Sequence, residues 1–296
     1  MLISIVIRTL NESFYLRELL KKIKSQELEN FQVETVIIDS GSTDDTLKIA
    51  EEFNCRITYI SKDDFTFGRS LNLGSKFADG DVLIYISGHC IPCNNSWLKN
   101  LVRPIINGKA DYVYGKQVGR DTTKFSESMI FEKYFPSYSK LPQDDFFCNN
   151  ANSAISRDAW NEYKFDEEVT GLEDMELAKR LYTNKGKIGY LSDASVYHIH
   201  NESWIQTKRR YEREAIAMQK IMPEIYIKFT DLIRYIAVSI ISDSKEAMLR
   251  KSLAIEIFGI IKFRIAQYYG SYIGNHNNRK LSKKSKEKYF YPKKDL

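Results

Sequence analysis

The sequence predicts an α/β fold, in which a mostly parallel sheet is flanked by helices and followed by a C-terminal helical extension. Over the first 90 residues, short runs of β-branched residues alternate with segments of helical apolar spacing. Strands separated by helices of this length imply right-handed βαβ crossovers and therefore parallel pairing. Beyond Trp204 the apolar spacing is helical as far as about Tyr269, which predicts the extension.

The predicted elements follow one another along the chain. Strands are expected at residues 3–7, 33–38, 56–60, 82–86 and 188–198, and helices near residues 16–23, 47–53 and 173–184. The first two strands end in the polar clusters Thr9–Glu12 and Asp39–Asp44, and the carboxyl ends of parallel strands are where such sheets bind ligands. The weakly patterned aromatic stretch from Tyr112 to Phe147 is expected to be a mobile flap.

Composition excludes several classes of protein. With 43% hydrophobic and 28% charged residues, the 296-residue chain is typical of a soluble globular protein rather than a disordered or collagenous one. The net charge of +5 is concentrated at one end: residues 278–296 carry eight basic and two acidic side chains, a net +6, which leaves −1 for the rest. The body is therefore not a basic nucleic-acid-binding module, and no nucleic-acid partner is expected.

The N-terminus and the cysteines bear on location. Met1 leads directly into an apolar strand without a signal-peptide pattern, and the most apolar stretch, residues 232–241, is about half the length that a bilayer needs. The four Cys are expected to be reduced, unreactive thiols, although Cys90 and Cys93 have the spacing of a redox or zinc pair. We expect a cytoplasmic protein, peripheral to the inner face of the cell membrane if its tail binds there.

Six motifs in order give the chain a resemblance to a known family. They are Ser4–Glu12 (SIVIRTLNE), Val36–Asp44 (VIIDSGSTD), Phe67–Gly74 (FGRSLNLG), Ala78–Asp81 (ADGD), Gly171–Asp174 (GLED), and His198–His200 (HIH) with Arg209–Tyr211 (RRY). Over roughly the first 215 residues, this pattern resembles the family 2 glycosyltransferases, in particular their rhamnosyltransferase-like branch. The resemblance implies a GT-A fold, whose Rossmann-like, mostly parallel mixed sheet binds a nucleotide-sugar.

The resemblance implies a donor site at the ends of the first strands. Asp39 is expected to accept the imide N–H of a uracil or thymine ring, Gly41 to allow a sharp turn, and Arg69 to reach the base or the diphosphate. The other residues expected at the donor site are Thr9, Asn11, Glu12, Ser87 and His89. Simpler explanations stay open, since Asp39 can end a strand and cap a helix, and Arg69 can be a solvated surface charge.

The Asp-x-Asp metal motif of that family is replaced here by Ser87-Gly88-His89. Loss of the carboxylate should weaken a Mg²⁺ site, because hard cations prefer oxygen ligands, whereas imidazole can bind Mn²⁺. Two outcomes follow. Either His89 and His200 hold a divalent metal, Mn²⁺ or Mg²⁺, with the diphosphate and water completing the shell, or His89 contacts phosphate directly and cationic side chains replace the metal.

Glu173 and Asp174 open a predicted helix, where the helix dipole by itself favours negative charge. In the resembling family the Asp of this motif is the general base that deprotonates the acceptor hydroxyl. Asp174 is therefore expected to be the base, and Glu173 to orient the acceptor or the sugar. The amides of Asn149, Asn150 and Asn152 are expected to bind hydroxyls of the donor sugar or the acceptor, unless they are turn residues.

These expectations describe an inverting glycosyltransferase. It moves a sugar from a nucleotide-diphosphate sugar, with UDP- or dTDP-sugars favoured, to a hydroxyl of a saccharide or lipid-linked acceptor in the synthesis of a surface polysaccharide such as capsule or O-antigen. Because the Asp-x-Asp is lost, a non-catalytic or a CMP- or GDP-sugar-using variant is the first alternative. A sugar-phosphate nucleotidyltransferase is the second, although Arg8–Glu12 lacks the Gly-rich loop of such enzymes.

Three regions are predicted: a catalytic domain over residues 1–205, a helical region over 206–277 and a flexible basic tail over 278–296. The apolar spacing in residues 253–263 favours a core or homodimer face, with an amphipathic contact to acidic lipid as the alternative. The tail mixes lysines with Tyr289, Phe290 and Tyr291, which suits an anionic membrane surface or a simply solvated tail.

Overall fold

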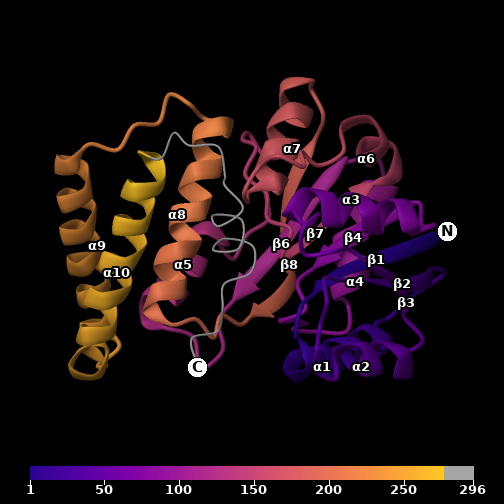
Figure 1. Cartoon of the computed structure of the whole chain (residues 1–296), viewed down its shortest axis with the longest axis horizontal. Coiled ribbons are helices and arrows are strands. Elements are labelled where there is room, and N and C mark those ends of the chain that lie inside the picture. Colours follow the sequence, from indigo (N-terminus) through magenta and orange to yellow (C-terminus); the bar gives the residue numbers. More distant parts are fainter. Residues whose placement is uncertain (277–296) are drawn as a thin grey trace. The chain divides into compact units, whose positions relative to one another are not determined.

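The computed structural model describes residues 1–276, so the basic tail predicted at residues 278–296 lies outside the described part of the chain. The chain divides into two compact units (Figure 1). The first comprises Met1–Arg120, Tyr134–Glu168 and Glu173–Ile199. The second comprises Asp121–Lys133, Val169–Leu172 and the segment that begins at His200.

The first unit contains a mixed sheet of eight strands with the order β3-β2-β1-β4-β7-β6-β8-β5. The strands are β1 (Leu2–Thr9), β2 (Gln32–Asp39), β3 (Arg56–Tyr59), β4 (Val82–Ile86), β5 (Cys90–Pro92), β6 (Tyr112–Val118), β7 (Asn152–Ser156) and β8 (Ile188–His198). Its helices are α1 (Ser13–Lys24), α2 (Thr46–Glu52), α3 (Phe67–Phe77), α4 (Trp97–Ile106), α6 (Arg157–Tyr163) and α7 (Glu173–Thr183). The predicted α/β fold class is confirmed.

Pairing is parallel where the strand–helix alternation predicts it. The neighbours β3, β2, β1 and β4 are parallel, as are β6 and β8. Strand β7 runs antiparallel to both β4 and β6, and β5 runs antiparallel to β8. The parallel half brings the carboxyl ends of β1 and β2 to the same edge, where both predicted polar clusters begin.

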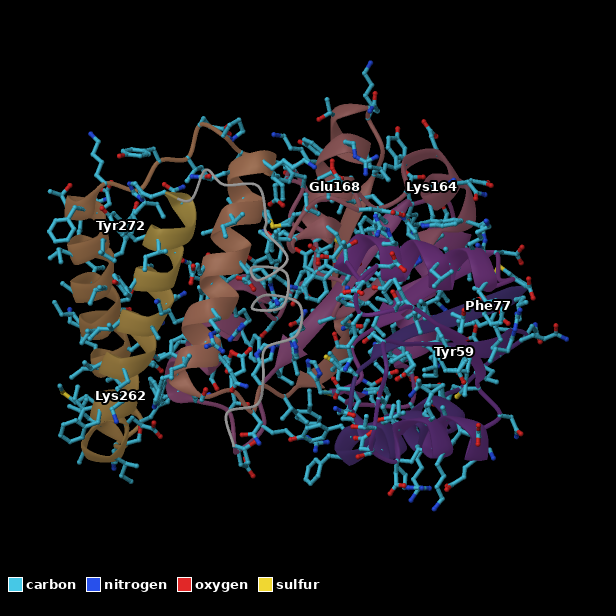
Figure 2. The ribbon with its side chains drawn as sticks, in the orientation of Figure 1. Tyr59, Phe77, Lys164, Glu168, Lys262 and Tyr272 are labelled. Atoms are coloured by element: carbon cyan, nitrogen blue, oxygen red, sulfur yellow. The ribbon has the colours of Figure 1, made fainter. Side chains whose placement is uncertain are left out.

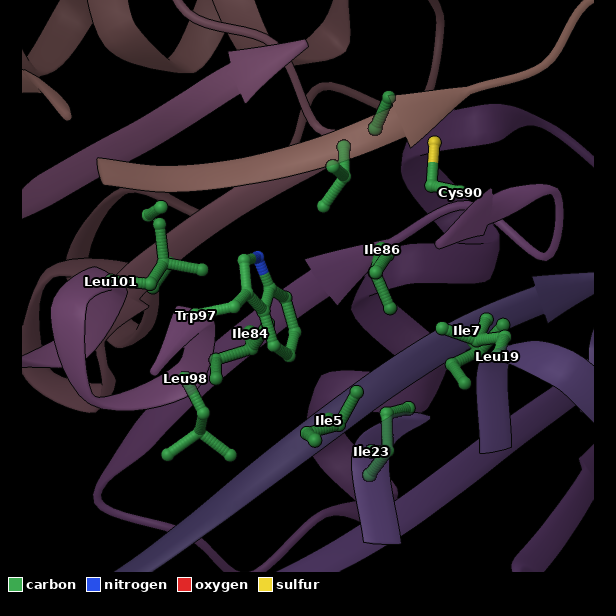
Figure 3. Close-up of a cluster of buried hydrophobic side chains, with 14 of the residues drawn as sticks. Ile5, Ile7, Leu19, Ile23, Ile84, Ile86, Cys90, Trp97, Leu98 and Leu101 are labelled. Carbon is green, nitrogen blue, oxygen red and sulfur yellow. The ribbon is translucent and has the colours of Figure 1, made fainter. Parts of the chain in front are cut away.

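Helices cover both faces of the sheet, and consecutive strand residues point alternately to one face and to the other. On β1, Ile5 belongs to one cluster with Leu19 of α1 and Trp97 of α4 (Figure 3). The next residue, Val6, points to the opposite face, which α3 covers. There α3 approaches so closely that a Cβ on Gly74 would lie 2.8 Å from Val6 Cγ1. Central strands packed this way read as continuous apolar runs, which explains why the sequence predicts them well.

One prediction about this unit is wrong. The stretch from Tyr112 to Phe147, expected to be a mobile flap, begins with β6, which pairs with β7 and β8 inside the sheet. Tyr112 and Val113 are fully buried, and the ring of Tyr114 contacts that of Phe147 with centroids 5.3 Å apart. Aromatic residues supply the apolar area of this strand, but their polar atoms weaken the hydrophobic alternation by which strands are recognised.

The second unit is helical in its described part, and it confirms the predicted C-terminal extension. Its helices are α5 (Phe125–Tyr134, whose last residue belongs to the first unit), α8 (Trp204–Ile221), α9 (Phe229–Leu249) and α10 (Leu253–Asn275). Helix α8 begins at a capping box, in which Ser203 accepts from the N–H of Gln206 and the Gln206 side chain accepts from the N–H of Ser203. Within residues 1–276, none of the helices is long and apolar enough to cross a bilayer.

Helix packing in the second unit depends on small and paired side chains. A Cβ on Gly270 of α10 would lie 2.3 Å from the backbone oxygen of Lys208 in α8, so only glycine permits this approach. Between α9 and α10, the buried Asp243 accepts two hydrogen bonds from Arg264, at 2.7 and 2.8 Å. The hydroxyl of Ser126 in α5 also donates to Asp243, at 2.6 Å, so three helices share one buried ion pair.

Candidate active site

The predicted donor-site residues gather where β1 and β2 end. Thr9 and Asp39 are register partners at the ends of these parallel strands, and Thr9 Oγ1 donates to Asp39 Oδ1 at 3.0 Å. Ser42 donates twice to Asp39, from its hydroxyl at 2.5 Å and from its N–H at 2.8 Å. Gly41, at a φ of 96°, donates its N–H at 2.9 Å. Asp39 therefore holds the turn after β2, as the simpler explanation expects, and its contact with a base stays a prediction.

Asn11 and Glu12 join the end of β1 to the same turn. The N–H of Asn11 donates to Ser42 Oγ at 2.9 Å, and Asn11 Oδ1 accepts from the N–H of Thr43 at 2.8 Å. The N–H of Glu12 donates to Thr46 Oγ1 at 2.8 Å. These bonds fasten the two polar clusters into one rim at the edge of the sheet.

Ser87 and His89 lie in the connection from β4 to β5, and His89 contacts this rim. The Nδ1–H of His89 donates to Glu12 Oε1 at 3.1 Å, which leaves the ring lone pair on Nε2. The ring of His89 stacks on that of His198 at the end of β8, with centroids 5.3 Å apart and planes 22° from parallel. The replaced metal motif therefore sits beside a second imidazole.

His198 is oriented by an amide rather than by a carboxylate. The side-chain N–H of Gln117 donates to Asn149 Oδ1 at 2.9 Å, so its Oε1 is the atom that faces His198 Nδ1 at 2.6 Å. His198 must donate there, and its Nε2 carries the lone pair. Ring nitrogens of His89 and His198 lie within 4.8 Å of each other. Imidazoles whose Nδ1–H is held by an outer acceptor are typical of metal-binding histidines.

His200, the other predicted metal ligand, begins the second unit. Its Nδ1 is bound by Glu127 Oε1 at 2.8 Å, and the same oxygen accepts from Arg210 at 2.5 Å. Arg210 also donates to Glu202 at 3.0 Å. Because His89 and His200 belong to different units, their action as a ligand pair stays a prediction.

Asp174 is buried at the start of α7. Its Oδ2 accepts from the N–H of Asn150 at 2.7 Å and its Oδ1 from the N–H of Met175 at 2.8 Å. Burial and then the adjacent Glu173 raise the pKa of Asp174 to about 7, against the lowering effect of the two N–H groups. Such a carboxyl can take up a proton near neutral pH, which is what a general base requires.

Glu173 reaches β1 through Arg8, a residue that the sequence does not single out. Arg8 donates to Glu173 Oε1 at 3.2 Å and to the backbone oxygen of Phe67 at 3.3 Å, with its guanidinium 4.9 Å from the centre of the Phe67 ring. It is the cation that partly lowers the pKa of Asp174. The only local signal for Arg8 is a charge inside a β-branched strand, just before the polar cluster.

The three predicted asparagines differ in their surroundings. Asn150 Oδ1 accepts from the hydroxyls of Tyr112 (2.5 Å) and Ser153 (2.8 Å), while its buried Nδ2 has no hydrogen-bond partner among residues 1–276. Asn149 orients Gln117, as described above. Asn152 is fully buried, and its side-chain nitrogen and oxygen all bind protein groups. This arrangement favours a structural role for Asn152, and the sugar contacts of all three stay predictions.

Arg69 is engaged elsewhere on the same unit. Its Nε donates to Glu167 at 2.8 Å and its Nη1 to the backbone oxygen of Asp64 at 2.9 Å. The ion pair is the main reason that the pKa of Arg69 is raised. A contact between Arg69 and a nucleotide therefore has to compete with Glu167.

The cysteine pair after β4 shows no sign of redox activation. All four Cys are free, and Cys90 is buried. Burial raises the pKa of Cys90 well above its ordinary value, and it raises that of Cys93 as well. Both thiols stay protonated at neutral pH, which removes the nucleophilic form.

The first unit combines a Rossmann-like sheet with a polar rim at its strand ends, a stacked pair of histidines and a carboxyl whose pKa is near 7. Its fold is that of the GT-A glycosyltransferases. A mannosyltransferase from Pyrobaculum calidifontis, PcManGT, in complex with GDP-Man and Mn²⁺, superimposes with a TM-score of 0.66 at 14% identity, over 94% of this chain and 87% of that one. At this identity the likeness shows the fold alone.

The chain belongs to the family described as Glycosyl transferase family 2, whose model matches residues 4–164. It is 27% identical over 260 residues to the poly(ribitol-phosphate) beta-N-acetylglucosaminyltransferase TarS of Staphylococcus aureus, 85% of this chain and 43% of TarS. It is 28% identical over 225 residues to the O-antigen chain rhamnosyltransferase RfbN of Salmonella typhimurium, 71% of this chain and 70% of RfbN. The chain thus spans less than half the length of TarS.

Proposed function

We propose that the chain is an inverting glycosyltransferase that moves a sugar from a nucleotide-diphosphate sugar to a hydroxyl of a saccharide or lipid-linked acceptor. The observation that carries this is Asp174, a buried carboxyl with a pKa of about 7 beside the orphan amide of Asn150, in a chain of this family. The biosynthesis of a cell-surface polysaccharide is the proposed context, because TarS and RfbN are named for such reactions.

In the proposed reaction Asp174 takes the proton of the acceptor hydroxyl as its oxygen attacks the anomeric carbon. The bond between that carbon and the diphosphate oxygen breaks, and the nucleoside diphosphate leaves with the electron pair. Glu173, held by Arg8, orients the acceptor or the sugar, and the Nδ2–H of Asn150 supplies a donor for a sugar hydroxyl. A single displacement of this kind inverts the anomeric configuration.

The proposed nucleotide site is the rim formed by Thr9, Asn11, Glu12 and the turn from Asp39 to Ser42. Asp39 already accepts four hydrogen bonds, so an imide N–H can bind only if the Ser42 hydroxyl turns away. We favour uracil or thymine as the base, with cytosine or guanine as alternatives.

Histidine ligands fit a transition metal better than Mg²⁺. His89 and His198 both present Nε2 with Nδ1–H held by an outer acceptor, and imidazole suits Mn²⁺ and its neighbours. We propose that this pair, with His200 as the further predicted ligand, holds a divalent metal when the donor is bound. The metal would supply positive charge that stabilises the leaving diphosphate. PcManGT is described with both GDP-Man and Mn²⁺.

The proposals on location and assembly rest on features of the sequence and not on the geometry of the site. We propose a cytoplasmic enzyme at the inner face of the membrane, where lipid-linked acceptors lie. The contact of the basic tail with anionic membrane and a homodimer through the C-terminal helices stay predictions.

Calorimetric titration with UDP, dTDP, GDP and CMP, with and without EDTA, tests the donor class and the metal together. We expect UDP or dTDP to bind most tightly and EDTA to weaken binding. If no nucleoside diphosphate binds, the chain is not a transferase of this type; if only CMP or GDP binds, the base assignment is wrong. With the turnover of a matching sugar nucleotide, the NMR coupling of the product anomeric proton distinguishes inversion from retention.

A further inference from the structure

Two helices of the second unit expose apolar side chains that the unit itself does not cover. On α10, Ile255 is 82% and Phe258 72% exposed, and Ile265 and Tyr269 are also exposed. Their spacing of three, seven and four residues places them on one side of the helix. The opposite side is buried, with Gly270 against α8 and Arg264 bonded to α9.

Helix α9 also exposes apolar side chains along one side. Val238, Ile241 and Met248 are exposed and lie within about one quarter-turn of one another, at about 100° per residue. Leu249 is the last residue of α9, and Ile255 lies in the first turn of α10. We call these residues the α9–α10 outer face: Val238, Ile241, Met248, Leu249, Ile255, Phe258, Ile265 and Tyr269.

The charged side chains that lie among the residues of the outer face are lysines. Lys245 lies between Ile241 and Met248 on α9, and Lys262 between Phe258 and Ile265 on α10; both are exposed (Figure 2 labels Lys262). At one end Lys208 of α8 lies 4.9 Å from the ring centre of Tyr269.

The acidic side chains of α9 and α10 form ion pairs with arginines or project away from the outer face. Asp243 is buried against Arg264, and Glu246 pairs with Arg250 at 2.8 Å. Asp231, in the first turn of α9, pairs with Arg234. Glu256 projects to a different side of α10 from Phe258, because the two are 200° apart around the helix.

We propose that the α9–α10 outer face lies in the headgroup region of an anionic membrane. Such a surface offers apolar depth for Phe258 and Ile255 and negative charge for Lys245 and Lys262. The helices would lie on the bilayer, since none of those in residues 1–276 can cross it.

A second copy of the chain fits this face less well. A symmetric contact places each patch against its own copy, which brings cations such as Lys262 toward one another. Lysine is also depleted in the cores of protein interfaces. The inference goes beyond the proposed transfer reaction, because it concerns a surface that carries none of the proposed site residues.

Flotation of the full chain with lipid vesicles tests the proposal. We expect binding to phosphatidylcholine vesicles that contain about one third phosphatidylglycerol, and weak binding to phosphatidylcholine alone. The double variant Ile255→Glu with Phe258→Glu should bind at least about tenfold more weakly, since two apolar side chains lose their burial. Lys262→Glu should weaken binding to anionic vesicles only.

Phe14→Glu is the matched control, because Phe14 is 84% exposed on α1 of the first unit and should leave vesicle binding unchanged. Circular dichroism confirms that each variant is folded. The basic tail is intact in every variant, so unchanged binding of the Ile255/Phe258 variant overturns the proposal and assigns binding to the tail. Loss of a dimer in light scattering, with no vesicle binding by the parent chain, would assign the face to a second copy instead. Neither result depends on turnover of any sugar nucleotide.

Discussion

Asp174 in the first unit and Glu127 in the second are both buried carboxyls, but their surroundings act in opposite directions. Burial and Glu173 raise the pKa of Asp174 to about 7. Burial also raises the pKa of Glu127, but His200 and Arg210 outweigh it and lower that pKa to about 2. The comparison shows that the kind of neighbour, and not the depth of burial, decides whether a carboxyl can exchange protons at neutral pH.

The two groups therefore affect stability in different ranges of pH. The folded pKa of Asp174 lies above its unfolded value, so it contributes stability at low pH that is lost as pH rises toward 7. The folded pKa of Glu127 lies below its unfolded value, so its contribution is present above about pH 4.5 and is lost as pH falls toward 2. Asp174 can therefore exchange a proton near neutral pH, whereas Glu127 stays ionised and binds His200 and Arg210.

The largest effect is expected from Asp174→Asn. The rate of sugar transfer should fall by about 10²–10⁴-fold, because an amide cannot accept the proton. The loss of stability between about pH 4 and 7 should also disappear, since the titrating group is gone. Steady-state kinetics and urea denaturation at several pH values measure the two effects. Asp193→Asn, at an exposed position in β8, is the control. Full activity of Asp174→Asn would exclude it as the base.

Breaking the Glu127 network should cost stability. Glu127→Gln leaves Arg210 with one buried partner fewer, and we expect a loss of about 3–5 kcal/mol in the free energy of unfolding. Glu132→Gln is the matched control on the same helix, because the ion pair of Glu132 with Arg250 is exposed and worth about 0–1 kcal/mol. Equal losses in the two variants would show that the buried Glu127 network contributes no more to the free energy of unfolding than an exposed ion pair does.

The contrast can be sharpened by removing the cation near Asp174. Arg8→Gln should raise the pKa of Asp174 further, because Arg8 lowers it now. The acid limb of the kcat/KM profile should move to higher pH, by on the order of one pH unit. A profile that keeps its position while kcat falls would point to a contact of Arg8 with substrate rather than to an effect on the base.

The smallest effect concerns a carboxyl two residues from Asp174. Glu176 pairs with Arg180 one turn further along α7, at 2.8 Å. Glu176→Gln should cost about 0.3–0.5 kcal/mol in thermal or urea unfolding and leave transfer activity intact. A large loss of activity would show that the whole acidic turn, and not Asp174 alone, serves the reaction.

Much of the fold can be predicted from the sequence because the strands and helices produce local apolar periodicity. The strands β1, β2 and β4 each contain a run of buried apolar residues, and Asp174 lies at the start of a helix whose apolar spacing is clear. The strand β6 is missed because its tyrosines carry both apolar area and polar atoms. The site partners are missed for another reason: Arg8 and Glu173 are 165 residues apart, and Glu127 meets Arg210 across 83. No local pattern encodes such distant pairs.

The order of segments in the two units has a consequence for recombination. The chain passes between the units five times, and residues 121–133 belong with the helices that begin at His200. An exchange of α8 to α10 between relatives that leaves α5 behind would separate Glu127 from Arg210 and Ser126 from Asp243. The second unit is therefore discontinuous in sequence, and functional chimeras should form only when α5 and the helices α8 to α10 come from the same parent.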